Sequence, residues 1–311
     1  MSQRFVTVLL LSTLLAGCDG NPFGTVGSGT TPGTGGGTST STIPGSLSVN
    51  VKAVAYDGTN LAMQIEGLDS TPTVVPFTRY GALDVPGYKA YKVQEDALDR
   101  MFVALAAESQ DGATRAVAVA DGGQFQRYYG GGYYERDGAF DRPSIGTGPG
   151  AGQVSYAGNY AGVTNVGVPG NPDALPVLPG TNPAVIPDQP ARVTGDIFMN
   201  VNFEDNLVNG TIYNRVITDI GFALDDVVLI PTGISDTGTF EGTVEGEAPN
   251  EGDVTGTYGG IFGGTNSSSV AGIVHLTAFE GSFDNEQEHG VFVLTECSLQ
   301  PVGGICDQTA P

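Results

Sequence analysis

The chain has 311 residues, which is enough for two ordinary domains and a sizeable buried core. Glycine contributes 48 residues and proline 19, and charged residues make up only 15% of the chain, so the composition argues against helical bundles and coiled coils and favours strands joined by tight turns. Acidic residues outnumber basic residues by 34 to 12, and this net charge of −22 argues against nucleic-acid binding, because phosphates require a basic surface.

The first eighteen residues have the form of an export signal. Arg4 precedes an apolar run from Phe5 to Leu15 that is too short to span a bilayer, and the run ends in the sequence LAGC at residues 15–18. Small residues before a cysteine are typical of a bacterial lipoprotein signal, in which Cys18 carries the lipid, palmitate included. An ordinary secretory signal with a chance cysteine is the alternative. We expect residues 1–17 to be a signal peptide and the lipid to hold the protein at a membrane.

Residues 18–45 are predicted to be a flexible tether. Of the 27 residues from Asp19 to Gly45, 22 are glycine, threonine, serine or proline. Such a segment cannot bury enough apolar surface to offset the entropy of ordering it. Its r.m.s. reach is about 30 Å, which would hold the folded part away from the lipid surface.

Residues 46–150 are predicted to form a small β-rich domain. Alternating apolar residues and turn signals indicate three hairpins, with strands at 46–56 and 61–65, at 100–107 and 114–120, and at 124–129 and 133–136. The third hairpin would turn at the triple glycine 130–132. Residues 97–109 also have helical spacing, so a helix is the alternative there. Residues 143–152 are typical of a linker.

Residues 151–311 are predicted to form an eight-stranded antiparallel β-barrel, so the fold class is all-β. The expected strands are 153–161, 193–203, 207–217, 221–230, 238–245, 253–262, 270–279 and 290–296. Short turns between them fit an up-and-down barrel, whose closure removes exposed edges. A two-sheet sandwich is the alternative, because periodicity alone does not separate the two.

Residues 163–191 stand apart because they contain seven prolines. Proline removes amide donors and fixes φ, so this segment is predicted to be a long, partly polyproline II loop at one barrel mouth. Its apolar residues follow no strand or helix period, and we expect them either to contact a partner or to plug the barrel. The candidate contact residues are Val168, Leu175, Leu178 and Ile186.

Paired tyrosines on each side of the triple glycine form a second candidate surface. Exposed tyrosines beside arginine suit partner recognition, and the candidates are Arg127, Tyr129 and Tyr134. Neighbouring strand residues point to opposite faces, so one tyrosine of each pair is expected to pack inward. The alternative is that the tyrosines pair across the strands and only stabilise the hairpin.

Motifs for catalysis or metal binding are sparse. Asp236 begins an Asp-Thr-Gly-Thr sequence like that of aspartic proteases, but that chemistry needs two such loops, and an ordinary turn is the favoured interpretation. His275 and His289 lie near Glu286 and Glu288, yet a metal site needs three or four converging ligands. We therefore expect no catalytic residue, no metal and no cofactor.

Cys297 and Cys306 enclose eight residues near the C-terminus. Once Cys18 is lipidated they are the remaining thiols, and in an exported protein they are expected to form a disulfide bond that pins the tail to the last strand. A reactive or metal-binding pair is the alternative.

Two segments resemble a known barrel family. The sequence YAGNYAG at 156–162 and the stretch 255–272 are similar to the C-terminal β-barrel of transferrin-binding protein B and factor H-binding protein, which are bacterial surface lipoproteins. Matching positions are Phe262, Gly264, Asn266, Ser267 and Gly272, while Gly263, Thr265 and Ser269 replace the family's Tyr, Pro and Glu. The resemblance covers about residues 151–296, and it implies that residues 46–150 form a handle-like domain.

These observations favour a non-enzymatic binding module anchored by lipid in the bacterial cell envelope, at the outer membrane, facing the periplasm or the cell surface. Its expected partner is a protein or small molecule that it captures, or a receptor that it assists, and the chain itself is expected to be a monomer. The alternative is a structural envelope lipoprotein without a dedicated ligand. A third hypothesis is a dimeric aspartic protease that uses Asp236.

Overall fold

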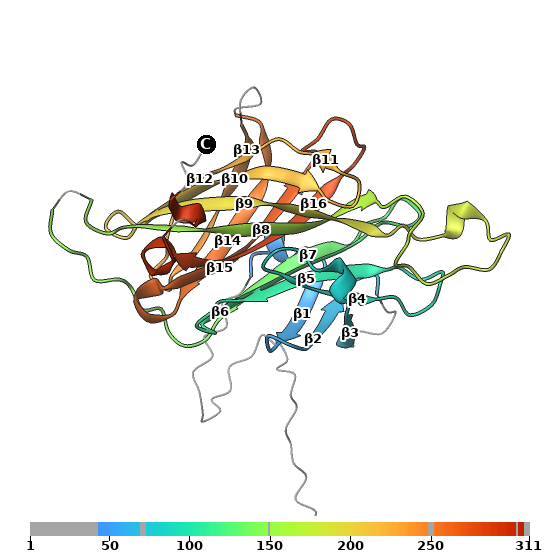
Figure 1. The fold of residues 1–311 in the computed structure, drawn as a ribbon, viewed down its shortest axis with the longest axis horizontal. Helices are drawn as coiled ribbons and strands as arrows, with labels where there is room; N and C mark the ends of the chain where they lie inside the picture. Colours follow the sequence, from blue (N-terminus) through green and yellow to red (C-terminus); the bar gives the residue numbers. More distant parts are fainter. Residues whose placement is uncertain (1–42, 69–72, 149, 248–251, 303, 308–311) are drawn as a thin grey trace, which may run out of the picture.

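The structure is a computed structural model, and it describes residues 43–307 apart from 69–72, 149, 248–251 and 303. Two antiparallel sheets lie against each other, and the fold is all-β as predicted (Figure 1). The predicted signal peptide, Cys18 and nearly all of the predicted tether lie outside the described residues.

The first sheet is a seven-stranded meander with its strands in sequence order. Its edges nearly meet, because the Asn50 amide donates to the Gly130 carbonyl at 3.0 Å and the Asn50 side chain accepts from the Gly130 amide at 3.1 Å. The strands are β1 (Val51–Tyr56), β2 (Leu61–Ile65), β3 (Val75–Arg79), β4 (Lys89–Val93), β5 (Phe102–Glu108), β6 (Thr114–Asp121) and β7 (Gly130–Arg136).

The second sheet closes on itself. In order round the ring, β8 pairs with β9, β9 with β10, and β10 with β12; the ladder then runs through β13, β14, β15 and β16 back to β8. The ring has eight strands, so the predicted barrel is confirmed and the sandwich is wrong. Its strands are β8 (Gln153–Gly167), β9 (Pro190–Asn202), β10 (Leu207–Ile217), β12 (Val227–Gly233), β13 (Thr239–Gly246), β14 (Val254–Gly263), β15 (Ser269–Thr277) and β16 (Gln287–Glu296), with the two-residue β11 (Phe222–Ala223) beside β10.

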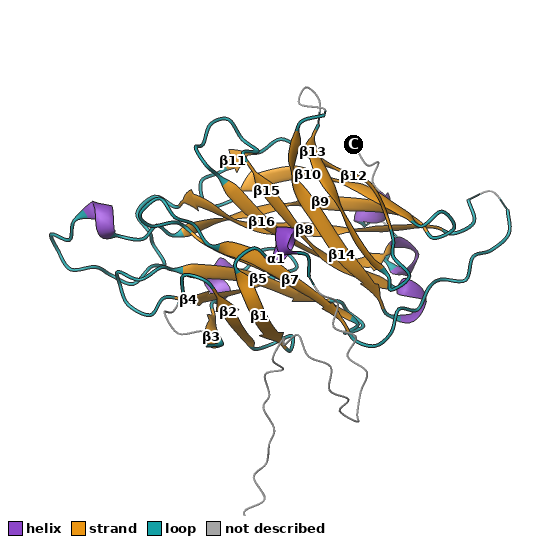
Figure 2. Ribbon diagram, turned by 180° about the vertical axis from the view of Figure 1, so that it is seen from behind, coloured by secondary structure: helices purple, strands orange, loops and turns teal. Residues whose placement is uncertain are grey.

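In the described part of the chain, helical structure is confined to single turns (Figure 2). They are α1 (Gly45–Ser48), η1 (Gly81–Leu83), η2 (Pro183–Val185), η3 (Thr265–Ser267), η4 (Cys297–Leu299) and η5 (Ile305–Asp307). Within the described residues, none is long and apolar enough to cross a membrane.

Three apolar cores hold the molecule together. One fills the barrel, one fills the first sheet, and the third lies between them and joins β5, β6 and β7 to the outer face of β8, β15 and β16. Strands β5 and β6 are therefore buried on both faces, and their alanine-rich sequences let the sheets approach closely. Because both faces are apolar, residues 97–109 lack a clean strand period; β5 shows that the strand interpretation is correct.

The triple glycine is not a turn, and the predicted third hairpin is wrong. Gly130, Gly131 and Gly132 begin strand β7, while residues 122–129 form the connection from β6. A side chain at Gly130 would meet the His289 ring, and a Cβ at Gly132 would lie 2.6 Å from Ile273 of the barrel. Gly130 and Gly132 are needed because barrel side chains occupy the space beside them, and a Cβ at Gly131 would meet the Ser48 carbonyl.

Other boundaries also differ from the predictions. A strand was expected from residue 46, but residues 45–48 form the single helical turn α1, in which the amides of Leu47 and Ser48 donate to the Pro44 carbonyl. Strands β3 and β4 were not predicted, since Pro76 interrupts the pattern of β3. The single strand expected over 221–230 is split into β11 and β12, and the proline-rich loop is shorter than expected, spanning 168–189.

His275 and His289 stack face to face between the barrel and the first sheet. Their ring centroids are 4.6 Å apart, and the His275 Nδ1 lies 3.0 Å from the Ser46 carbonyl oxygen. Burial lowers the pKa of both imidazoles, most strongly at His289, whose pKa the neighbouring His275 lowers further. Both rings are therefore neutral in the folded protein near pH 7.

We expect this pair to make stability depend on pH. The unfolded chain takes up protons near its ordinary pKa of about 6.5, whereas the folded chain does not, so stability is full above that pH and falls as the pH drops below it. The maximal slope is about 1.4 kcal/mol per pH unit for each histidine. Urea unfolding between pH 7 and pH 5 measures it, and a His289→Phe variant should show a shallower slope. Equal slopes in both proteins would contradict this role.

The predicted disulfide bond between Cys297 and Cys306 is present, with Cα atoms 5.5 Å apart. It ties η4 to η5 after the last barrel strand. The Gln300 side chain in the enclosed loop donates to the carbonyls of Ala157 and Thr295, at 2.9 and 2.7 Å. The bridge therefore seats the C-terminal tail on the barrel.

Candidate functional site

The proline-rich loop 168–189 projects beyond the strands at one end of the molecule (Figure 1). Val168 is buried and packs into the barrel core, which supports a plug role for the loop base. Ile186 is half-buried. Leu175 and Leu178 are 42% and 81% exposed, so the outer part of the loop presents apolar side chains to solvent.

The base of this loop is held rigidly by Gln189, which is fully buried. Its backbone amide donates to the side-chain oxygen of Asn171 at 2.9 Å. Its side chain accepts from the Asp173 amide at 2.8 Å and donates to the Asp173 carboxylate at 2.9 Å. From the first sheet, Lys92 donates to the Asp173 carbonyl at 2.7 Å and the Tyr80 hydroxyl to its carboxylate at 3.0 Å. The base of the loop is thus tied both to its own residues and to the first sheet.

The connection 122–129 is also clamped. Arg100 forms an ion pair with the buried Asp121, donates to the carbonyls of Gln124 and Arg127 at 2.8 Å each, and stacks over the Tyr129 ring at 4.8 Å. Burial raises the pKa of Asp121, although hydrogen bonds from the Tyr129 amide and Arg100 oppose this rise. These contacts fix the loop on the end of β6.

The tip of this connection is strained. Phe125 and Gln126 occupy the two central turn positions with φ of 54° and 58°, in the left-handed region that favours glycine. Each non-glycine residue there costs about 1 kcal/mol. Phe125 is nevertheless 64% exposed, so packing does not explain its choice. Its exposure and its strained backbone make Phe125 a candidate binding residue.

Three loops combine into one surface, which we call the distal loop surface: residues 94–101, 122–129 and 168–189. The Gln124 side chain donates to the carbonyls of Leu98 and Val185, at 2.9 Å each. The Leu175 amide donates to the Gln94 side chain at 2.7 Å. Four of the large exposed apolar side chains belong to this surface: Leu98, Phe125, Leu175 and Leu178.

The structure separates the tyrosine candidates from one another. Arg127 is exposed on the distal loop surface, and among the described residues its guanidinium has no hydrogen-bond or ion-pair partner. Tyr129 is half-buried beneath Arg100. Tyr134 is only 2% exposed, because it packs into the core between the sheets, where burial raises its pKa; a partner cannot reach it.

The residues considered for catalysis or metal binding do not converge. His289 points toward the first sheet while Glu288, one residue earlier, points into the barrel. In the part of the chain that the structure describes, no group of three histidine, cysteine or carboxylate side chains could hold a metal ion. Asp236 lies in an exposed turn between β12 and β13, where Ser235 and Thr239 share hydrogen bonds.

Sequence reasoning missed a buried ionic cluster inside the barrel. Arg215 donates to Glu288 at 2.7 Å and to the Asp225 carbonyl at 2.6 Å, and the Tyr160 hydroxyl donates to the other Glu288 oxygen at 2.5 Å. The Arg215 guanidinium also stacks on Phe279 at 5.3 Å. Burial and the charge of Glu288 hold the pKa of Tyr160 well above its usual range.

No protein-family model and no curated protein sequence matches the chain. Among solved structures, intact Ap-TbpB with its N and C lobes aligns at 12% identity over 78% of this chain and 43% of that chain, with a TM-score of 0.41. A double mutant of transferrin-binding protein B from Haemophilus parasuis Hp5 aligns at 11% identity over 78% and 42%, with a TM-score of 0.41.

Isotype 1 transferrin-binding protein B from serogroup B Neisseria meningitidis aligns at 12% identity over 81% of this chain and 42% of that chain, with a TM-score of 0.38. The chain thus spans less than half of the length of these three structures. At this level of similarity, we argue the function from the chain's own residues alone.

Proposed function

We propose that this protein is a lipid-anchored protein of the bacterial envelope that binds a protein partner through the distal loop surface. The observation that carries the proposal is the exposure of Leu98, Phe125, Leu175 and Leu178 on three loops that hydrogen bonds hold together. Exposed apolar and aromatic side chains on an ordered scaffold are typical of binding hot spots, and the adjacent free Arg127 suits a polar rim.

The anchor is part of the same proposal. Lipid at Cys18 and the glycine-rich residues after it would hold the folded part near the outer membrane with its loops free, as a monomer. A Cys18→Ala variant should accumulate as an unprocessed precursor that palmitate does not label. Cleavage before residue 18 together with palmitate labelling in that variant would show that the lipid is attached elsewhere.

The binding test compares two leucines with different surroundings. Leu178→Ser on the distal loop surface should weaken capture of the partner from membrane extract by about 30-fold, the loss typical of a hot spot. Leu207→Ser removes another exposed leucine, at the start of β10, and should leave capture unchanged. Both variants should keep the natural melting temperature, because neither side chain is buried.

The same test separates binding from a purely structural role. A structural envelope protein would show no saturable partner, or equal capture by the natural chain and by Leu178→Ser. A second variant, Phe125→Ser, tests the neighbouring loop independently. It should also weaken capture. The hydrogen bonds from Arg100 to the backbone carbonyls of that loop remain in this variant.

A further inference from the structure

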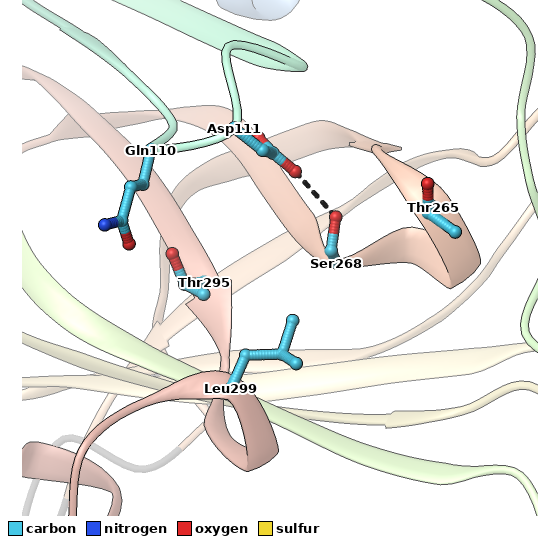
Figure 3. Close-up of a pocket in the computed structure, with 6 residues that line it drawn as sticks. All are labelled: Gln110, Asp111, Thr265, Ser268, Thr295 and Leu299. Carbon is cyan, nitrogen blue, oxygen red and sulfur yellow. Dashed lines mark hydrogen bonds between the residues drawn. The ribbon is translucent and has the colours of Figure 1, made fainter.

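A cavity of about 440 Å³ lies at the opposite end of the molecule from the distal loop surface, where the β5–β6 turn of the first sheet meets the barrel (Figures 1 and 3). Ligand sites occur preferentially at such junctions. The lining comes from three chain segments and consists of Gln110, Asp111, Thr265, Ser268, Thr295 and Leu299.

One wall of the cavity is a strained turn that long-range contacts hold in place. Asn266 and Ser267 both have positive φ, at 51° and 57°. The Asn266 amide donates to the Asp141 carboxylate at 2.9 Å, and the buried Tyr156 hydroxyl donates to the Ser267 carbonyl at 2.6 Å. This turn presents Thr265 and Ser268 to the cavity (Figure 3). Strain of this kind persists only where surrounding contacts compensate for it.

Asp111 gives the cavity a fixed negative charge. Its carboxylate accepts hydrogen bonds from the Ser109 hydroxyl at 2.5 Å, the Ser268 hydroxyl at 2.6 Å and the Ala113 amide at 3.0 Å. Although burial opposes it, these hydrogen bonds lower the pKa of Asp111. No lysine or arginine lines the described cavity, so an anionic ligand would meet repulsion without a counter-charge.

Three neutral polar side chains in the lining are free to bind a ligand. Within the described residues, the side chains of Gln110, Thr265 and Thr295 form no hydrogen bond with the protein, and all three line the cavity together with Leu299 (Figure 3). An amide and two hydroxyls supply both donors and acceptors. Leu299 is exposed and adds an apolar contact.

We propose that this cavity binds a neutral saccharide. Sugar hydroxyls donate and accept at closely spaced positions, which matches one amide and two threonine hydroxyls, and Asp111 has lone pairs left to accept from a further hydroxyl. Leu299 would cover the C–H face of the ring. A cationic ligand fits less well, because the single carboxylate already accepts three hydrogen bonds. The site shares no residue with the distal loop surface, so the tests of sugar binding and of partner binding are independent of each other.

Saturation-transfer NMR on the full-length chain tests the proposal with glucose, galactose, N-acetylglucosamine, maltose and lactose as probes. We expect at least one to bind with a dissociation constant of about 1 mM or tighter. The anionic N-acetylneuraminic acid should give no signal. A Gln110→Ala, Thr295→Val double variant should weaken binding by about tenfold or more, since two hydrogen bonds are lost.

Thr257→Val is the matched control. Thr257 is a half-buried threonine of β14 outside the cavity, and this variant should bind the sugar as the natural chain does. Absence of a signal from all five neutral sugars would overturn the proposal, as would a sugar whose binding the double variant leaves unchanged. Equal binding of N-acetylneuraminic acid would overturn the charge argument. Unfolding curves of each variant show that any loss of binding arises in the folded protein.

Discussion

A Gly132→Val variant should unfold at a much lower urea concentration than the natural chain. A Cβ at Gly132 would lie 2.6–2.7 Å from three side-chain carbons of Ile273, which is fully buried in the core between the two sheets. Neither strand can retreat, because β7 is paired with β6 and β15 lies between two barrel strands. Overpacking of this kind costs about 1–3 kcal/mol, and valine adds three carbons at the contact.

Two further variants locate the cause. Gly146→Val places the same side chain in a connection where nothing lies within 4 Å, and it should leave the urea midpoint unchanged. An added Ile273→Ala substitution makes room for the valine and should recover part of the loss, which a general effect of glycine flexibility would not predict. A Gly132→Val protein as stable as the natural chain would show that the two sheets are not packed as described.

The strands of the barrel could be predicted because each has one face inside the ring and one outside. Period-two alternation and short turns that contain Asp, Asn or Gly mark local structure, and the prediction placed a strand at or near every member of the ring. The triple glycine carries no such local signal. Its role depends on His289 and Ile273, which lie more than 140 residues away in the sequence. Glycine-rich sequence is a turn signal by default, and tertiary packing overrode it here.

The distal loop surface could be predicted only in pieces. Seven prolines mark the 163–191 segment as a loop, and Arg127 and Tyr129 marked the other connection as a candidate. That these loops meet depends on Gln124, whose side chain reaches Leu98 and Val185 from the middle of an unremarkable polar stretch. Tyr134 was misjudged for a related reason, since strand alternation does not show that the first sheet's outer face is covered by the barrel.

The buried pair of Arg215 and Glu288 should show the largest loss of stability on substitution. Their side chains are 1% and 0% exposed. A charge removed from water is tolerated only when its partner and the surrounding hydrogen bonds are in place. The Glu288 carboxylate neutralises the Arg215 guanidinium and accepts a hydrogen bond from the Tyr160 hydroxyl. Substituting Glu288 breaks both contacts and leaves an unpaired guanidinium in the apolar barrel interior.

A Glu288→Leu variant should therefore lose about 3–5 kcal/mol of unfolding free energy, the range for removing one member of a buried ion pair. Glu66→Gln is the matched control, because it breaks the pair with Lys52, whose side chains are both about half exposed. Exposed pairs contribute little, so this variant should unfold almost as the natural chain does. Urea unfolding of the three proteins at pH 7 makes the comparison.

The double variant Arg215→Met, Glu288→Leu distinguishes the effect of an unpaired buried charge from the effect of changing the shape of the side chain. Replacing both partners with apolar side chains of similar volume removes the unpaired charge, so much of the lost stability should return. If the double variant were as unstable as Glu288→Leu alone, the loss would come from the Tyr160 hydrogen bond and the shape of the site. If Glu288→Leu itself unfolded like the natural chain, Arg215 would have to reach solvent, and the closed, filled barrel described above would be wrong.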